Sequence, residues 1–196
     1  MESGKRGKGF GTVLLIISLL ANILLLVKYA ETARLQNTAW SNISAQFAKV
    51  AHWAAIDAER LSMYPVTEET FGLMYTNPNV ISSYLESISF LPYADKIVPF
   101  KFAEKIRILA NYQYRVMSLM EDEIKQKGKV SPENAARAKA LMEAWRALSG
   151  NISEEENKIY PFSAIFQERS WQKVWARGIE ALDKVELLPL PEEEKR

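Results

Sequence analysis

The sequence contains no cysteine and a single histidine, His52, among its 196 residues. The missing cysteines exclude disulfide bonds, cysteine-based zinc sites and thiol catalysis. One histidine leaves little for metal binding or for proton transfer near neutral pH. The formal net charge is only +1, so the chain lacks the basic surplus that nucleic-acid binding requires. We therefore expect no enzymatic activity, no cofactor, no metal site and no nucleic-acid partner.

Glycine and proline are both missing from the long stretch between Gly11 and Pro65. These two residues interrupt helices most readily, so a helix in this stretch meets no local stop before Tyr64, which precedes the proline. An alternation of period two, which is typical of strands, is missing over any useful length of the chain. We predict an all-α fold.

The most pronounced pattern is an uncharged, apolar run at residues 9–27, which lysines flank on both sides. Its nineteen residues, at about 1.5 Å each, span roughly 28 Å, close to the thickness of the hydrocarbon core of a bilayer. The run is longer than the apolar part of a signal peptide, and no clean small-residue cleavage site follows it. We predict an uncleaved transmembrane signal anchor over residues 9–28; a cleaved signal is the alternative.

Basic residues are more numerous before the apolar run than after it. Lys5, Arg6 and Lys8 precede the run, whereas Lys28 and Arg34 follow it. Because basic flanks are retained on the cytoplasmic side, we expect residues 1–8 to form a short cytoplasmic tail. The rest of the chain would then be extracytoplasmic, in a single-pass protein of the cell membrane.

Two polar residues, Ser18 and Asn22, interrupt the apolar run. They are four positions apart and so lie on one face of a helix. A hydrogen bond to another helix stabilises an amide in lipid, so this face is a candidate for transmembrane association and for a weak homodimer. The alternative is that a strongly apolar segment tolerates one asparagine without consequence.

Beyond the anchor, apolar residues recur at alternating steps of three and four, which favours a narrow helical seam. The membrane-proximal seam begins with Trp40, Ile43, Phe47 and Val50. We predict that the anchor continues through residues 29–64 as one helix of roughly 50 residues. The seam is expected to pack against later helices or against a second copy of the chain.

Helical spacing and helix-end residues recur through residues 65–187. Ser131–Glu133 is a strong helix start, and Ser153–Glu156 matches a capping box that would open a separate turn of helix. The predicted helices cover residues 67–75, 80–91, 99–127, 132–149 and 162–187, with turns at 77–79 and 150–151. Together with residues 29–64 they are expected to form a bundle of four or five helices, followed by a flexible tail at 188–196.

Several side chains allow a functional interpretation, but a structural one is simpler. His52 has no second ligand at helical spacing. Asp57 falls where the seam predicts an apolar residue, and we expect it to form a structural ion pair. The acidic run at 154–156 lacks the alternating oxygens and the glycine of a calcium loop. One aromatic set would line either a ligand pocket or, as its helical spacing favours, the core: Tyr93, Phe100, Phe102, Tyr112, Tyr114, Trp171 and Trp175.

The sequence thus favours a non-enzymatic, membrane-anchored helical interaction module of the cell envelope that binds a protein partner or itself. The alternative is a ligand-sensing helical bundle that signals through a partner protein. An apolar cavity with converging polar groups would favour the sensor, whereas an exposed apolar patch would favour the interaction module.

Overall fold

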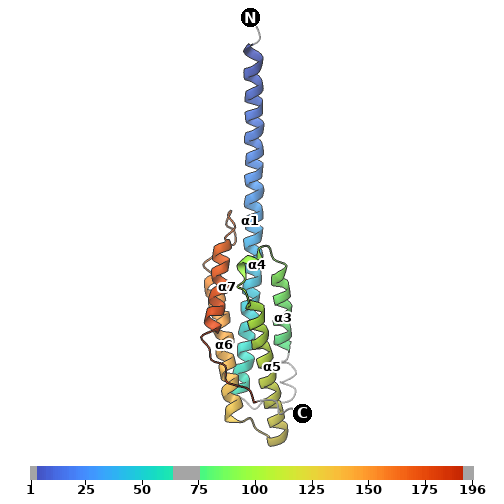
Figure 1. Ribbon diagram of the computed structural model, residues 1–196, viewed down its shortest axis with the longest axis vertical. Helices are drawn as coiled ribbons and strands as arrows, with labels where there is room; N and C mark the ends of the chain where they lie inside the picture. Colours follow the sequence, from blue (N-terminus) through green and yellow to red (C-terminus); the bar gives the residue numbers. More distant parts are fainter. Residues whose placement is uncertain (1–3, 64–75, 192–196) are drawn as a thin grey trace.

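Helix α1 (Gly4–Met63) is the longest element and carries both the apolar run and the predicted seam (Figure 1). The computed structural model describes residues 4–63 and 76–191. The prediction of one uninterrupted helix is confirmed, since no helix-breaking residue falls inside α1 after Gly11. Two further predictions, the stop at Tyr64 and the short helix at 67–75, lie outside the described residues.

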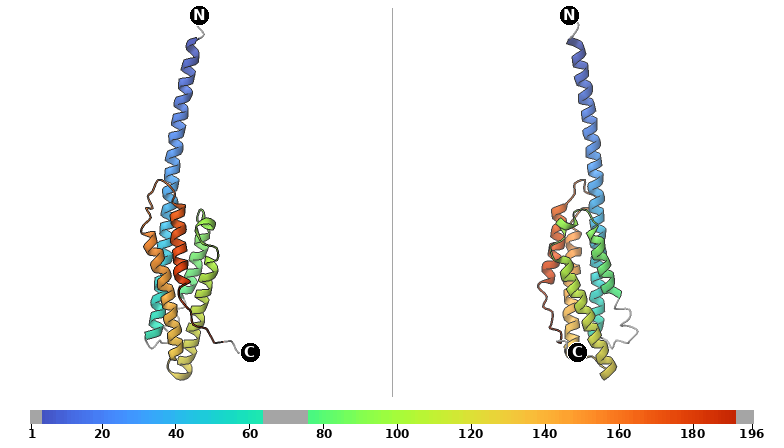
Figure 2. Two further views of the ribbon diagram at one scale, coloured as in Figure 1. Left: turned by 60° about the vertical axis from the view of Figure 1, so that its left-hand side comes forward. Right: turned by 45° about the vertical axis from the view of Figure 1, so that its right-hand side comes forward.

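The first half of α1 projects alone from the rest of the molecule (Figures 1 and 2). It is long and apolar enough to cross a membrane, and none of its most apolar window is buried by the protein. The core helix of a soluble protein would bury its apolar face, whereas here large side chains such as Leu24 and Leu25 are exposed. Within the described residues, α1 is the one candidate membrane span.

The other described helices lie around the second half of α1 (Figures 1 and 2). They are α3 (Thr76–Ser89), α4 (Ala94–Ile97), α5 (Phe102–Lys127), α6 (Pro132–Glu156) and α7 (Glu168–Leu182). Only helices, turns and irregular connections occur in the described ranges. The all-α prediction is therefore confirmed for that part of the chain.

The turn between α5 and α6 forms as its sequence predicts. Gly128 ends α5 with a φ of 69°, and its N–H donates to the carbonyl of Ile124 at 2.9 Å. This left-handed backbone favours glycine. Ser131 caps α6, because its Oγ accepts from the Asn134 N–H at 3.3 Å, and Pro132 occupies the first helical position. The short link makes α5 and α6 adjacent helices of opposite direction.

Three helix starts differ from the sequence-based prediction. Helix α3 begins at Thr76, so the turn predicted at 77–79 is wrong; a proline is tolerated there because the first N–H groups of a helix lack partners within it. Helix α5 begins at Phe102 rather than at Pro99, since Lys101 has a φ of 71° that interrupts the helical path. Helix α7 begins at Glu168 rather than at Phe162, for a reason given below.

Helix α6 is longer than predicted, because it passes through Gly150 and ends at Glu156. The predicted turn at 150–151 and the separate helix start at Ser153 are both wrong. Ile152 supplies the reason, since it is fully buried and continues the apolar stripe of α6. Burying such a side chain contributes about 1.5–3 kcal/mol, which exceeds the roughly 0.5–1 kcal/mol that a glycine inside a helix costs.

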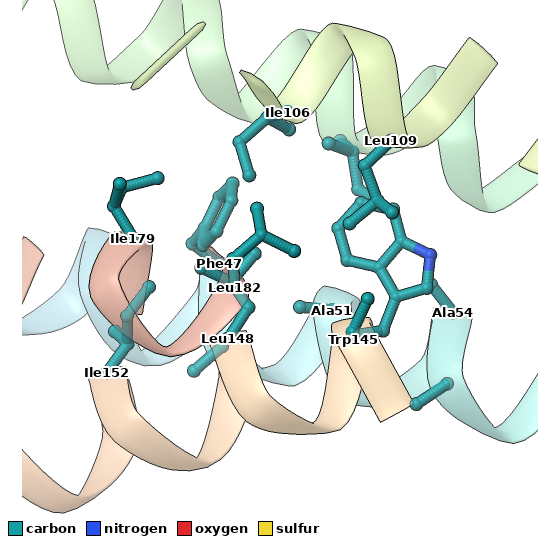
Figure 3. Close-up of a cluster of buried hydrophobic side chains, with 14 of the residues drawn as sticks. Phe47, Ala51, Ala54, Ile106, Leu109, Trp145, Leu148, Ile152, Ile179 and Leu182 are labelled. Carbon is teal, nitrogen blue, oxygen red and sulfur yellow. The ribbon is translucent and has the colours of Figure 1, made fainter. Parts of the chain in front are cut away.

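The closest packing in the domain is between α1 and α6, which lie side by side over most of their shared length. Helix α1 presents fully buried alanines along this part of its surface: Ala51, Ala54, Ala55 and Ala58. Larger side chains of α6, including Trp145 and Leu148, extend into the same cluster (Figure 3). Helix α7 approaches α6 at Gly178, where an added Cβ would lie 2.7 Å from Cγ1 of Ile152.

We expect residues 30–196 to fold as a soluble helical domain in which Trp145→Ala lowers the free energy of unfolding by about 3–5 kcal/mol. The ring is fully buried, and its Nε1 donates to Oε1 of Gln113 at 2.8 Å. Urea unfolding followed by circular dichroism measures the loss. Trp53→Ala is the matched control, because that ring is 47% exposed and its removal should cost little. Equal losses in the two variants would contradict this packing.

Candidate functional site

The predicted transmembrane pair, Ser18 and Asn22, lies in the uncovered half of α1. Every residue from 11 to 29 is exposed in the isolated chain. The described part of the folded domain therefore provides no hydrogen-bond partner for the Asn22 amide.

The predicted seam faces the protein's own helices. Trp40 and Phe47 are fully buried, and Ile43 and Val50 are partly buried against the same core. The ring of Trp40 lies 6.2 Å from that of Trp175 and 6.4 Å from that of Trp171, measured between ring centroids. The seam is thus occupied within one copy of the chain.

The aromatic set divides between core and surface. Phe102, Trp171 and Trp175 are fully buried and Tyr112 nearly so, whereas Tyr93, Phe100 and Tyr114 are exposed. Phe102 and Trp175 meet edge to face with their centroids 4.9 Å apart, a favourable geometry for a core pair. The buried members therefore build the core of the domain.

The two polar candidates on α1 have different surroundings. His52 is exposed and lies beside Ser149 and Ser153 of α6 in a shallow cleft. Asp57 is buried. In the described ranges no three His, Asp or Glu side chains are grouped so that they could hold a metal ion.

A polar turn of α1, formed by Asn37, Thr38 and Ser41, holds the connection between α6 and α7. Asn37 is fully buried. Its Nδ2 donates to the carbonyl of Ile165 at 3.0 Å, and its Oδ1 accepts from the N–H of Gln167 and from Nε1 of Trp171, both at 3.1 Å. These bonds engage the backbone of residues 165–167, and α7 consequently begins at Glu168.

The other two residues of the polar turn hold the earlier part of this connection. Thr38 Oγ1 donates to the carbonyl of Arg34 at 2.9 Å and lies 3.4 Å from the carbonyl oxygen of Pro161. Ser41 Oγ donates to Oε1 of Glu156 at 2.5 Å. Sequence reasoning missed this turn because its residues are polar. The spacing of the seam itself places Asn37 on the buried face of α1, because Asn37 precedes Trp40 by three residues.

Between these fixed ends, residues 157–167 rise beside α1 above the other connections (Figure 2). Phe162 and Ala164 line a cleft of about 420 Å³ together with Val27, Ala30, Glu31 and Arg34 of α1. The side chain of Phe162 is nevertheless 76% exposed, and those of Tyr160 and Ile165 are 75% and 65% exposed. Three apolar or aromatic side chains therefore lie open to solvent next to the end of the apolar run.

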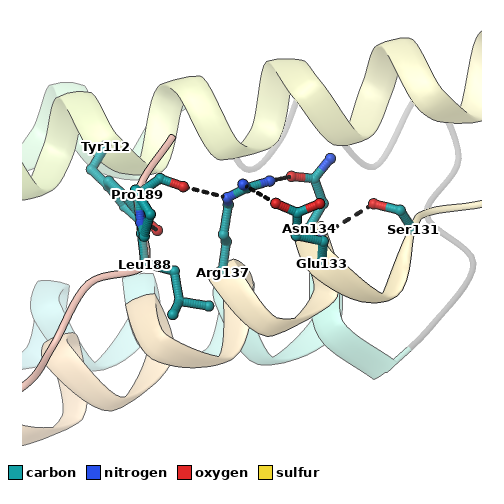
Figure 4. A network of polar contacts seen from close by, with 7 residues as sticks. All are labelled: Tyr112, Ser131, Glu133, Asn134, Arg137, Leu188 and Pro189. Atoms are coloured by element: carbon teal, nitrogen blue, oxygen red, sulfur yellow. Dashed lines mark hydrogen bonds and ion pairs between the residues drawn. The ribbon is translucent and has the colours of Figure 1, made fainter. Parts of the chain in front are cut away.

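At the opposite end of the domain, the start of the predicted tail is bound to the helices (Figure 4). Tyr112 Oη donates to the carbonyl of Leu188 at 2.8 Å, and Nε of the buried Arg137 donates to the carbonyl of Pro189 at 2.9 Å. Burial raises the pKa of the Tyr112 hydroxyl, and the positive charge of the nearby Arg137 partly offsets that increase. Residues 188–191 are thus held against the domain, whereas 192–196 lie outside the described residues.

A cleft of about 600 Å³ lies beside this contact, lined by Glu123, Ser131 and Arg137 among others. The Arg137 guanidinium also donates to Asn134 Oδ1 at 2.6 Å and to Glu133 Oε1 at 2.5 Å. The donors of Arg137 therefore bind groups of the same chain. We interpret the cleft as the edge of this structural contact between α6 and residues 188–191, not as a ligand site.

Two phenylalanines flank α4 along the chain and are almost fully exposed. Phe90 follows α3 and is 87% exposed, and Phe100 precedes α5 and is 92% exposed. Trp40 Nε1 donates to the Pro92 carbonyl at 3.0 Å, which fixes this connection against α1.

No known protein family, curated protein or solved structure matches this chain.

Replacing Asn37 by alanine should lower the free energy of unfolding of residues 30–196 by at least about 2 kcal/mol, because a buried donor or acceptor that loses its partner costs about 1–3 kcal/mol. The substitution removes the hydrogen-bond partner of Ile165, Gln167 and Trp171. Asn42→Ala is the control, since Asn42 is exposed on the same helix. Urea unfolding compares the two variants, and similar stabilities would remove Asn37 from this role.

Glu123 should make the domain sensitive to acid. Burial raises the pKa of its carboxyl, but hydrogen bonds from Ser131 and Asn134, together with the charge of Lys127, outweigh burial and lower the pKa. A lowered pKa stabilises the fold above the unfolded-state pKa, and this contribution is lost as the pH falls through the folded-state pKa. Glu123→Gln should cost about 1 kcal/mol at neutral pH, because it exchanges a hydrogen bond to a charged group, worth about 1.5–3 kcal/mol, for a neutral one worth about 0.5–1.5 kcal/mol. It should cost almost nothing in acid.

Urea unfolding at neutral and at acid pH tests this expectation. Glu121→Gln is the control, because Glu121 pairs with Lys125 on the surface of α5, where such a pair contributes about 0.3–0.5 kcal/mol. A constant difference between wild type and Glu123→Gln at all pH values would contradict the assignment.

Proposed function

We propose that this chain is a non-enzymatic, membrane-anchored interaction module of the cell envelope. Its N-terminus is cytoplasmic, α1 crosses the membrane once, and the outer domain is a helical bundle that binds a protein partner, a second copy included. The observation that carries the proposal is the continuity of α1, which runs without a break from an uncovered apolar segment into the buried core.

This continuity fixes how the outer domain is presented. A helix of 60 residues with no internal break has no hinge between its two halves. The second half is buried among α3, α6 and α7, so the bundle keeps a fixed position and orientation relative to the membrane helix. A fixed orientation suits a protein that offers a binding surface to another membrane protein, because less freedom is lost on binding.

Two regions are available for partners. Inside the membrane, the face with Ser18 and Asn22 is uncovered, and an amide in hydrocarbon is stabilised by a partner on another helix. Outside it, Phe90 and Phe100 are almost fully exposed on either side of α4. Trp40 binds the backbone between α3 and α4, which carries Phe90. Aromatic side chains are enriched at protein interfaces. The seam itself is buried, so a second copy would pair through the anchor.

Cross-linking in native membranes tests the proposal on the full chain. We expect a weak dimer that Asn22→Leu reduces, because one interhelical amide contributes about 1–2 kcal/mol or less. Ala21→Leu is the matched control, since it adds the same side chain beside Asn22 and leaves the amide in place. A dimer of equal yield in all three proteins would remove Asn22 from the interface.

The same membranes test the outer surface. A cross-linked or co-purified partner that wild type retains should be lost from the double variant Phe90→Ser, Phe100→Ser and kept by Ile108→Ser, whose parent side chain is exposed on α5. If wild type forms neither a dimer nor a complex in its native membrane, the interaction proposal fails.

A further inference from the structure

The connection between α6 and α7 reaches the end of the domain nearest the apolar run (Figure 2). Tyr160, Phe162 and Ile165 on this connection are exposed. Its tip, Phe162 to Ala164, shares a cleft with Val27, Ala30 and Arg34 of α1. Val27 is the last residue of the uncharged run. The tip therefore lies beside the point at which α1 would leave the hydrocarbon core.

The helix itself gives the depth of the tip. At about 1.5 Å per residue, Ala30 lies roughly 5 Å beyond Val27 along α1, and Arg34 roughly 10 Å beyond it. The polar interface on each side of a bilayer is about 5–7 Å thick. A side chain that lines a cleft with Val27 and Ala30 therefore falls at the level of the lipid headgroups.

The side chains of the tip suit that environment. Phe162 is 76% exposed at the tip, and Tyr160 and Ile165 on either side of it are also more than half exposed, although burial of such groups would be favourable. Aromatic and apolar side chains beside a polar scaffold are typical of segments that lie in the membrane interface. Lys28 and Arg34 are also exposed at this level, and their long side chains can reach headgroup phosphates.

The tip is held in this position. The polar turn of α1 binds both ends of the connection, through Asn37 at residues 165–167 and through Ser41 at Glu156, and Thr38 Oγ1 lies beside the Pro161 carbonyl. The apolar side chains are thus displayed at a fixed distance from the end of the apolar run, and little ordering is required when they meet lipid.

We propose that the α6–α7 connection inserts its tip, with the ring of Phe162, into the outer headgroup region of the phospholipid bilayer that α1 spans. The inference rests on the membrane span in the proposed function and adds a second, lateral contact with the same bilayer. One helix alone allows the domain to tilt and to rotate about the helix axis. A second contact on one side of α1 restricts both motions and faces the α6–α7 side of the domain toward the lipid.

The absence of cysteine permits a direct test with single labels on the full chain. Leu24→Cys, Phe162→Cys and Phe100→Cys each receive an environment-sensitive fluorophore, and each protein is placed in phosphatidylcholine nanodiscs. A fraction of the lipid carries a nitroxide quencher near the headgroup end of the acyl chain. All three parent side chains are largely exposed, so the labels should leave the fold unchanged, and circular dichroism checks this.

Leu24 reports the span, and Phe100 reports a site remote from lipid. Phe100 is two residues from Phe102, whose ring lies 5.5 Å from that of Phe47, and Phe47 is roughly 30 Å beyond Val27 along α1. We expect strong quenching at position 24, and quenching at position 162 at least about two-fold greater than at position 100, as insertion at the headgroup boundary requires. Ala164→Cys, a second site at the tip, should behave like Phe162→Cys.

The outcomes separate the two proposals. Quenching at position 24 together with equal, low quenching at 162, 164 and 100 would overturn the lateral contact and leave the span intact. No quenching at position 24 would overturn the span, and with it both the proposed function and this inference.

Discussion

The arrangement of the helical domain depends on how closely α1 and α6 approach each other. Alanines along α1 are fully buried at this contact, and α6 fills the remaining space with Trp145, Leu148 and Ile152. Small residues on one helix let large side chains of the other lie flat against its backbone, which maximises dispersion contacts. Gly178 plays the corresponding part on α7, because a Cβ there would collide with Ile152. These contacts set the spacing of three helices.

Buried polar groups then select one register for that packing. A stripe of alanines alone would tolerate a slip of one helical turn between α1 and its neighbours. Asn37 opposes such a slip, since it satisfies three groups of the 165–171 segment in one register only. Any other register would leave the fully buried Asn37 amide and Trp171 Nε1 without these partners. At the far end, Arg137 and Tyr112 hold the backbone after α7 in the same way.

The elements that the sequence predicts well are those that local chemistry decides. The length of α1 follows from the absence of glycine and proline, and the α5–α6 turn follows from Gly128, Ser131 and Pro132. The errors occur where distant residues outweigh local ones. Burial of Ile152 carries α6 through Gly150, and Asn37, 128 positions away from Ile165, delays the start of α7. No pattern within either segment contains that information.

The buried face of α1 was only partly predictable for a related reason. Alternating steps of three and four between apolar residues select Ile43 and Val50 for the seam, yet both are only partly buried, whereas Ser44, Ala48 and Ala51 lie deeper. Where two helices are close, the positions of nearest approach require small side chains, whether apolar or polar, rather than large apolar ones. The larger residues therefore move to the flanks of the contact.

The packing of α1 against α6 also limits how the chain could pair with a second copy of itself. A seam of alanine and serine between large neighbours is complementary to α6 in shape, and it is filled by the same chain. The second half of α1 has no comparable face left for a second copy. The apolar half has Ser18 and Asn22 on one uncovered face, so the two halves of α1 differ in that one is packed within the chain and the other is not.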